Sequence, residues 1–223
     1  MTLRILGFVA TLAVWNLVLN TEHRFRILIA TACTFAVYPT VWISRKVLDR
    51  HPTNERCVWL TSVLHIILMM LFGIAVVESV QTYLRSPEWS VPVPREIGTT
   101  LLVVTSVLTI LTVLNLALSG LGAPFALALS KRLASRWMYA WTRNPMVLGT
   151  LACLCSAAIY LQSLQFLLWV LVVVSPAWLI FLRVYEEREL EIRFGKPYLE
   201  YKAATPFFWP RKPAISRGKK ASA

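Results

Sequence analysis

The stretch Val147–Leu182, VLGTLACLCSAAIYLQSLQFLLWVLVVVSPAWLIFL, decides the fold class of this chain. It is apolar almost throughout and is too long for one ordinary membrane helix, which needs about 17–25 residues. Its middle is interrupted by the polar side chains of Gln162, Ser163 and Gln165. We therefore expect two membrane helices folded as a tight hairpin that turns near Leu161–Gln165.

Four further apolar runs precede this hairpin, and each has roughly the length of a bilayer crossing. They are Leu3–Asn20, Ile27–Ile43, Val58–Leu84 and Ile97–Leu118. The first run has no small-residue cleavage site before Glu22, so we expect an uncleaved helix rather than a signal peptide. The sequence thus predicts an all-α, polytopic membrane protein of about six membrane helices, with a cytosolic helical segment after the hairpin.

The composition agrees with this class of protein. Hydrophobic residues make up 57% of the 223 residues, charged residues make up 15%, and the mean hydropathy is +0.61. Soluble domains are about 45–50% apolar and about 25% charged. A chain of this length cannot bury so many apolar helices on every side in water. The nine Trp residues suit a bilayer interface.

The distribution of Lys and Arg predicts the orientation. The loops Ser44–Cys57 and Ser119–Met146 carry four basic residues each, whereas Thr21–Arg26 and Arg85–Glu96 carry two each. Basic loops favour the cytoplasmic side, so we expect both termini in the cytosol. The net charge of +12 is then mainly a topology signal. Attraction to anionic lipid headgroups explains the dispersed charges more simply than nucleic-acid binding does.

The polar chemistry is concentrated in the second half of the chain. We divide the sequence into N-terminal membrane helices (residues 1–118), a region with candidate site residues (119–211) and a basic tail that we expect to be disordered (212–223). The four Cys and three His residues show neither ligand spacing nor clustering, so we expect no metal site.

Two segments of the second region have identifiable helix ends. Asn144 and Pro145 suit the N-cap and the first turn of a helix, and Arg143 beside them can hold an anion. Gly195 is placed to close the helix that continues from the hairpin through Glu186 and Glu187. Each segment also has a simpler interpretation, an interfacial capped helix for the first and a solvated charged helix end for the second.

Taken in order, these segments resemble the isoprenylcysteine carboxyl methyltransferase and phospholipid methyltransferase family, and its bacterial members most closely. The similarity covers about residues 119–211. It rests on Gly120-x-Gly122-x-Pro124, Arg143-Asn144-Pro145-Met146-x-Leu148-Gly149, Glu186-Glu187-x-x-Leu190-x-x-x-Phe194-Gly195-x-x-Tyr198-x-x-Tyr201, Pro206 and Trp209-Pro210.

The resemblance implies a membrane enzyme that binds S-adenosyl-L-methionine on the cytosolic side and methylates a lipophilic or small hydrophobic acceptor from the bilayer. It also implies a multi-pass protein of a bacterial inner membrane, with the endoplasmic reticulum as the alternative. Arg143 and Glu187 match the functional Arg and Glu of the family. The matching cofactor-binding positions are Tyr139, Asn144, Pro145, Gly149, Glu186, Tyr198 and Tyr201.

Two positions depart from the family pattern. Val147 replaces a usual Tyr, and Trp137-Met138 replaces a usual Gly-Pro before Tyr139. Two alternatives therefore stay open beside the methyltransferase. One is a non-catalytic membrane module that retains the fold, and the other is a membrane reductase of the steroid-reductase type that uses NADPH.

Overall fold

The computed structural model describes residues 2–85, 90–120 and 132–212. Apart from one isolated antiparallel bridge between Ser90 and Ser163, the regular secondary structure of these residues is helical. The all-α class is therefore confirmed. Gly122, Pro124 and nearly all of the predicted tail lie outside the described residues, and the division into three regions stays a prediction.

Four long helices contain the first four predicted runs. They are α1 (Thr2–Leu19), α2 (His23–Arg50), α3 (Asn54–Arg85) and α4 (Arg95–Gly120). By length and composition, Arg24–Arg50, Arg95–Ser119 and Leu164–Phe194 can each cross a membrane, and Val9–Leu19 and Pro145–Tyr160 are shorter apolar helices. The exact number of crossings stays a prediction.

The hairpin predicted from the longest apolar run is present. Its arms are α6 (Pro145–Tyr160) and a helix that begins with α7 (Leu164–Trp169). Gln162 takes a positive φ of 58°, and the Ser163 hydroxyl caps α7 by accepting from Phe166 N. The Gln162 side chain donates to Val93 O at 2.7 Å, which ties the turn to the segment before α4. The polar interruption therefore forms the turn, as the sequence predicts.

The second arm runs without a break from Leu164 to Phe194 through two π-helical segments. It consists of α7, η2 (Val170–Val174), α8 (Ser175–Ile180), η3 (Phe181–Glu186) and α9 (Glu187–Phe194). Pro176 is the second residue of α8, two positions after the end of η2. A proline lacks the amide hydrogen and crowds the carbonyl four residues earlier, and a wider π turn relieves that conflict. The helix can therefore pass Pro176 and carry Glu186 and Glu187 on the same rigid element.

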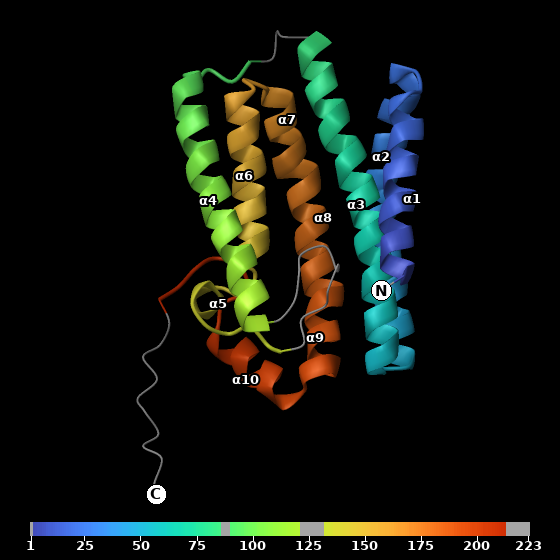
Figure 1. The fold of residues 1–223 in the computed structure, drawn as a ribbon, viewed down its shortest axis with the longest axis vertical. Coiled ribbons are helices and arrows are strands. Elements are labelled where there is room, and N and C mark those ends of the chain that lie inside the picture. The colour runs from blue at the N-terminus through green and yellow to red at the C-terminus, as the bar shows by residue number, and fades with distance from the viewer. Residues whose placement is uncertain (1, 86–89, 121–131, 213–223) are drawn as a thin grey trace, which may run out of the picture.

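The helices form an elongated bundle (Figure 1). α4 packs along α6, α1 and α2 pack on α3, and the long second arm contacts both α2 and α3. Buried apolar side chains from these helices, including Leu48, Leu64, Val170 and Phe181, form the main core. The short helices α5 (Met138–Trp141) and α10 (Lys196–Ala204) lie at the same end of the bundle as α9, and we call it the α10 end.

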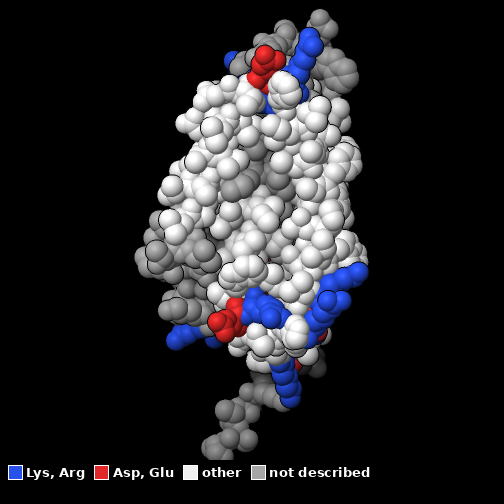
Figure 2. All heavy atoms as spheres, turned by 90° about the vertical axis from the view of Figure 1, so that its right-hand side faces the viewer, with Lys and Arg blue, Asp and Glu red and all other residues white. Residues whose placement is uncertain are grey.

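The surface separates into charged ends and an uncharged middle. In Figure 2 the Lys, Arg, Asp and Glu side chains gather toward the two ends of the visible face, with a broad uncharged band between them. On α4, many large apolar side chains are exposed, among them Val104, Val107, Leu111 and Leu118. An apolar band of this kind suits the hydrocarbon core of a bilayer.

Candidate active site at the α10 end

A buried ion pair between Arg143 and Glu187 is the centre of the candidate site. Arg143 Nη2 lies 2.8 Å from Glu187 Oε1, and each side chain is only 8% exposed. Arg143 comes from the segment between α5 and α6, and Glu187 is the first residue of α9. The fold therefore brings together the two side chains that the resemblance marks as functional, although they are far apart in the sequence.

The ion pair leaves several hydrogen-bonding atoms unused. Arg143 Nε and Nη1 and Glu187 Oε1 are buried and have no hydrogen-bond partner, because the close Arg143–Glu187 contact is not aligned as a hydrogen bond. Leaving such groups unpaired costs about 1–3 kcal/mol each, and more for charged groups. The unused N–H groups of Arg143 can therefore receive an anionic or carbonyl oxygen of a ligand.

Glu187 also contacts a second cation, which sequence analysis missed. Lys202 Nζ of α10 lies 2.8 Å from Glu187 Oε2 and 2.9 Å from Glu191 Oε1. Burial alone would lower the pKa of Lys202, but the hydrogen bonds to Glu187 and Glu191 outweigh it and raise that pKa above its usual value. Lys202 directly follows Tyr201 and lies one turn after Tyr198. Its position beside Tyr201 was the only sequence signal for it.

Glu186 differs from its neighbour. It is partly exposed and has no ion pair or hydrogen bond in the described part of the chain. Its carboxylate interacts electrostatically with the phenols of Tyr139 and Tyr198. Glu187 is thus neutralised by two cations. Burial and the carboxylates of Glu189 and Glu187 raise the pKa of Glu186 to about 8, although Arg193 acts in the opposite direction, so the Glu186 carboxyl group is largely protonated near pH 7.

Three of the predicted cofactor-binding residues are tyrosines that line the same end. Tyr198 is buried, its ring lies 6.2 Å from that of Tyr201, and the Tyr201 hydroxyl donates to Tyr139 O at 2.7 Å. Burial raises the pKa of Tyr139, Tyr198 and Tyr201, so all three phenols are neutral near pH 7. They form a mostly dry aromatic wall that links α5 to α10.

The C-terminal segment is fastened to the start of α6. The Asn144 amide donates to Phe207 O at 2.8 Å, Arg143 N donates to Pro206 O at 2.9 Å, and the Thr142 hydroxyl donates to Phe208 O at 2.8 Å. Asn144 is the N-cap residue of α6, but its side chain makes no capping bond. Phe207 also packs its ring 5.6 Å from the Arg143 guanidinium. These bonds hold Arg143 in place.

Pro145 and Gly149 lie on α6, where the structure gives each a local role. Pro145 is the first residue of the helix and is buried. A Cβ added to Gly149 would lie 2.8 Å from Thr109 Oγ1, so the glycine allows α4 to approach closely. A role of either residue in cofactor binding stays a prediction, as do the catalytic roles of Arg143 and Glu187.

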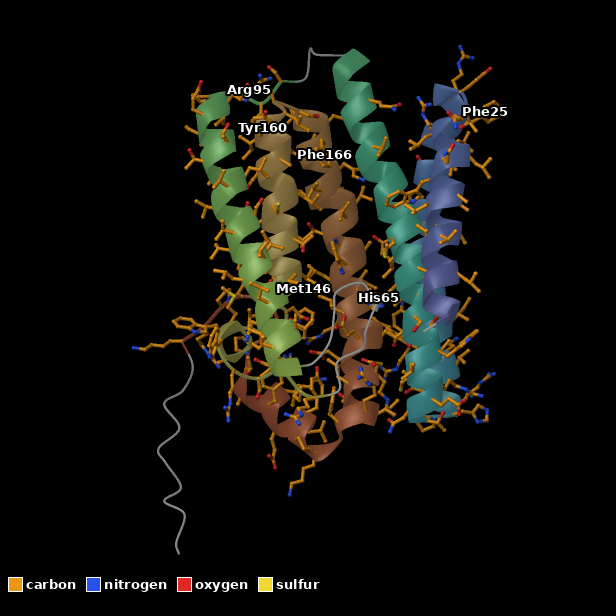
Figure 3. The ribbon with its side chains drawn as sticks, viewed as in Figure 1. Phe25, His65, Arg95, Met146, Tyr160 and Phe166 are labelled. Atoms are coloured by element: carbon orange, nitrogen blue, oxygen red, sulfur yellow. The ribbon has the colours of Figure 1, made fainter. Side chains whose placement is uncertain are left out.

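His65, an ionisable residue within the third predicted run, has a packing role in the structure. Its Nδ1 lies 2.8 Å from Thr61 O, and its ring meets Phe181 edge to face at 5.4 Å. Figure 3 shows His65 between α3 and the second arm of the hairpin.

Comparison with known proteins gives one result. The family model for phospholipid methyltransferases matches residues 93–197. The predicted family resemblance is therefore confirmed, and the match includes α4, which the predicted region from residue 119 left out. Searches of curated proteins and of solved structures gave no match. The family implies methyltransferase activity in an integral membrane protein. The matched residues include Arg143 and Glu187 but not Tyr198, Tyr201 or Lys202.

Proposed function

We propose, on the premise that residues 93–197 carry the family region of the phospholipid methyltransferases, that this chain is an S-adenosylmethionine-dependent methyltransferase. It transfers a methyl group to a lipophilic or small hydrophobic acceptor. The observation that carries the proposal is the buried Arg143–Glu187 pair with its unpaired Arg143 nitrogens. A buried arginine with unpaired N–H groups is arranged to bind an anionic group of a ligand.

The residues present fit the proposed cofactor. When bound, S-adenosylmethionine supplies a methyl group on a positively charged sulfonium. The unpaired Nε and Nη1 of Arg143 suit the carboxylate of its amino-acid tail. The faces of Tyr139 and Tyr198 suit a cation, and the Glu186 carboxyl group, whose pKa is raised to about 8, can ionise when a cation lies beside it.

In this proposal each residue acts by binding and orientation. Glu187 holds the Arg143 guanidinium, and Lys202 offsets the second oxygen of Glu187. Asn144 fastens the loop that carries Arg143, while Tyr139, Tyr198 and Tyr201 exclude water. Methyl transfer is an in-line displacement, for which alignment and a dry site matter more than acid–base groups.

The site lies at the end of the apolar band, so an acceptor can reach it from the membrane. Membrane lipids are therefore the proposed surroundings and the source of the acceptor, and nucleic acid has no role. The excess of basic residues in the predicted cytosolic loops favours the α10 end as the cytosolic one. We propose that the protein resides in a bacterial inner membrane with this end, and both termini, in the cytosol.

The test is calorimetric titration of the detergent-purified protein with S-adenosylmethionine and S-adenosylhomocysteine. We expect saturable binding of both, weakened at least about tenfold in two variants. Arg143→Gln removes the N–H donors proposed for the ligand carboxylate, and Glu187→Gln leaves the buried Arg143 charge without its carboxylate partner. Matched controls are Arg136→Gln, an exposed arginine before α5, and Glu200→Gln, an exposed glutamate on α10. Both controls should bind like the wild type.

The remaining outcomes separate the alternatives. Binding of NADPH in place of the two sulfur compounds would favour the membrane reductase. Absence of all three would favour a non-catalytic module, in which Val147 in place of the usual Tyr has altered the cofactor pocket. Equal binding by the wild type and both site variants would mean that the cofactor binds elsewhere.

A further inference from the structure

Trp137, the residue before α5, has a backbone conformation that ordinarily requires glycine. Its φ is 58° and its ψ is −121°, and Gly195 has almost the same pair of angles, 56° and −134°. A residue with a side chain rarely adopts a positive φ, because its Cβ crowds the backbone. The family pattern described above usually has Gly at the position of Trp137. This chain therefore keeps a glycine-type turn and places a strained tryptophan in it.

The Trp137 side chain makes little contact with the rest of the protein. The residue is 74% exposed. A strained backbone conformation persists where its surroundings stabilise it, and such positions are concentrated where a protein contacts a ligand. Packing within the protein does not supply that stabilisation for Trp137, so its indole is placed for contact with something outside the chain.

Two more exposed tryptophans accompany Trp137. Trp141 ends α5, and Trp209 lies in the segment after α10. These two segments are joined, because Arg211 N donates to Trp141 O at 3.0 Å. In Figure 1 α5 and the segment after α10 lie together at the α10 end. We call the exposed surface formed by Trp137, Trp141 and Trp209 the tryptophan face.

The charge around the tryptophan face is positive. Residues 132–144 and 205–212 include no Asp or Glu, and Arg132, Arg211 and Lys212 are among their exposed cations. Basic residues beside a membrane span attract anionic lipid headgroups, and Trp is enriched where a bilayer meets water. An anionic lipid surface is therefore complementary to this face both in charge and in polarity.

The tryptophan face also lies at the depth of lipid headgroups. α6 begins at Pro145, four residues after Trp141. α4 packs antiparallel along α6 and ends at Gly120 at the same end of the bundle. Leu118, near that end of α4, is exposed and belongs to the apolar band. The face is thus placed where the apolar band ends.

The opposite side of the same segment faces the candidate site. Tyr139 lies between Trp137 and Trp141 in the sequence, but it is buried, and its carbonyl accepts the hydrogen bond from Tyr201. α5 therefore presents a tyrosine to the site and tryptophans to the outside, so it separates the site from the surface.

We propose that the tryptophan face is a lipid-binding surface that inserts among the anionic headgroups of the leaflet at the α10 end. The indole of Trp137 lies between headgroups and acyl chains, and Arg211 with its neighbouring cations contacts lipid phosphates. This contact holds α5, and with it the outer wall of the candidate site, at the membrane surface. It concerns the outward side of α5 and is independent of the proposed function.

The test measures tryptophan fluorescence of the protein reconstituted in vesicles that contain equal amounts of phosphatidylcholine and phosphatidylglycerol. One of the two lipids carries brominated acyl chains, which quench a tryptophan on contact. The difference between wild type and Trp137→Ala reports the fluorescence of Trp137. We expect both brominated lipids to quench it, and phosphatidylglycerol to quench it at least about twofold more strongly, since basic residues concentrate anionic lipid.

Charge variants test the headgroup preference. Arg211→Gln should bring the quenching by the two lipids closer to equal. Lys196→Gln, which removes an exposed cation of α10 outside the tryptophan face, should leave the twofold difference unchanged. Equal quenching by both lipids in the wild type would overturn the preference for anionic headgroups. Absence of quenching by either lipid would overturn the lipid contact itself.

The melting temperature in detergent tests whether Trp137 is strained. Trp137→Gly and Trp137→Ala both remove the indole, but only glycine relieves the positive φ. Trp137→Gly should therefore melt above Trp137→Ala, and a lower value would overturn the strain that singles out this residue. If bromine does not quench Trp137 and Trp137→Gly converts a dimer into monomers, a second copy of the chain covers the face, and the lipid proposal is wrong.

Discussion

At the residue scale, Lys202 is the cation that connects α10 to α9. It contacts Glu187 and Glu191 within 3 Å, and Glu191 in turn contacts Arg188 at 3.2 Å. The Lys202 side chain is 33% exposed, so solvent screens part of these interactions. The contribution of Lys202 to the free energy of unfolding should therefore lie between that of a surface ion pair and that of a buried ion pair.

Lys202→Met should destabilise the protein by about 1–2 kcal/mol, because two partly buried carboxylates lose their shared cation. The raised pKa of Lys202 sets the pH dependence. Its contribution is fully present below about pH 10.4, the ordinary lysine value, and is lost as the pH rises through the raised value. The difference in melting temperature between wild type and variant should stay constant from pH 7 to about pH 10 and should shrink above that pH. Lys196→Met, at an exposed lysine, is the control.

At this scale, the sequence predicted the site residues that belong to a family motif. It did not predict the residues that join the site only through contacts in the folded protein. Arg143 and Glu187 were predicted as one site, and the fold brings them together. Lys202 and Phe207 were missed. Their partners are Glu187 and Glu191 on α9 for Lys202, and Asn144 and Arg143 before α6 for Phe207. These contacts depend on how the C-terminal segment folds back, which hydrophobic periodicity does not define.

At the element scale, two glycines set how closely α4 approaches α6. A Cβ on Gly98 would lie 2.5 Å from Tyr160 N and 2.7 Å from Tyr160 Cα, which are backbone atoms that cannot move independently. A Cβ on Gly149 meets the side chain of Thr109 first, at 2.8 Å. Small residues at such crossings allow close helix packing in membranes.

Gly98→Ala should therefore cost more stability than Gly149→Ala, about 2–3 kcal/mol against about 1 kcal/mol. Thermal melting in detergent measures both. Thr99→Ala, at an exposed neighbour of Gly98, should change little. Equal effects of the two glycine variants would mean that the helices separate as easily at one crossing as at the other.

The hairpin could be predicted from the sequence because its turn carries three polar residues in an apolar run. The two π-helical segments η2 and η3 could not. Their cause at η2 is a conflict between Pro176 and the preceding turn, and a helix can resolve such a conflict by a kink, a break or a π turn. Sequence periodicity does not distinguish these outcomes, although the choice determines which way Glu186 and Glu187 face.

At the scale of the whole molecule, the N-terminal helices are attached to the site end by charge. Asp49 of α2 contacts Arg188 of α9 at 2.9 Å and Arg45 at 2.6 Å, and Arg45 donates to Val184 O at 2.8 Å. The first helices therefore brace the element that carries Glu187. Composition indicated that they span the membrane, but it gave no sign of this contact with the second half.

The membrane orientation is the last testable consequence of the architecture. Pro92 and Arg211 are exposed, and they lie at opposite ends of the bundle, because Val93 contacts the hairpin turn and Arg211 N bonds to Trp141 O beside α5. In a variant with its four native cysteines replaced, an impermeant maleimide should label Pro92→Cys from the outside of right-side-out vesicles. It should label Arg211→Cys only in inverted vesicles, since basic loops stay in the cytosol. The reverse pattern would put the Arg143 site on the outer face, where a cytosolic cofactor could not reach it. Labelling of both positions from one side would mean an even number of crossings between them.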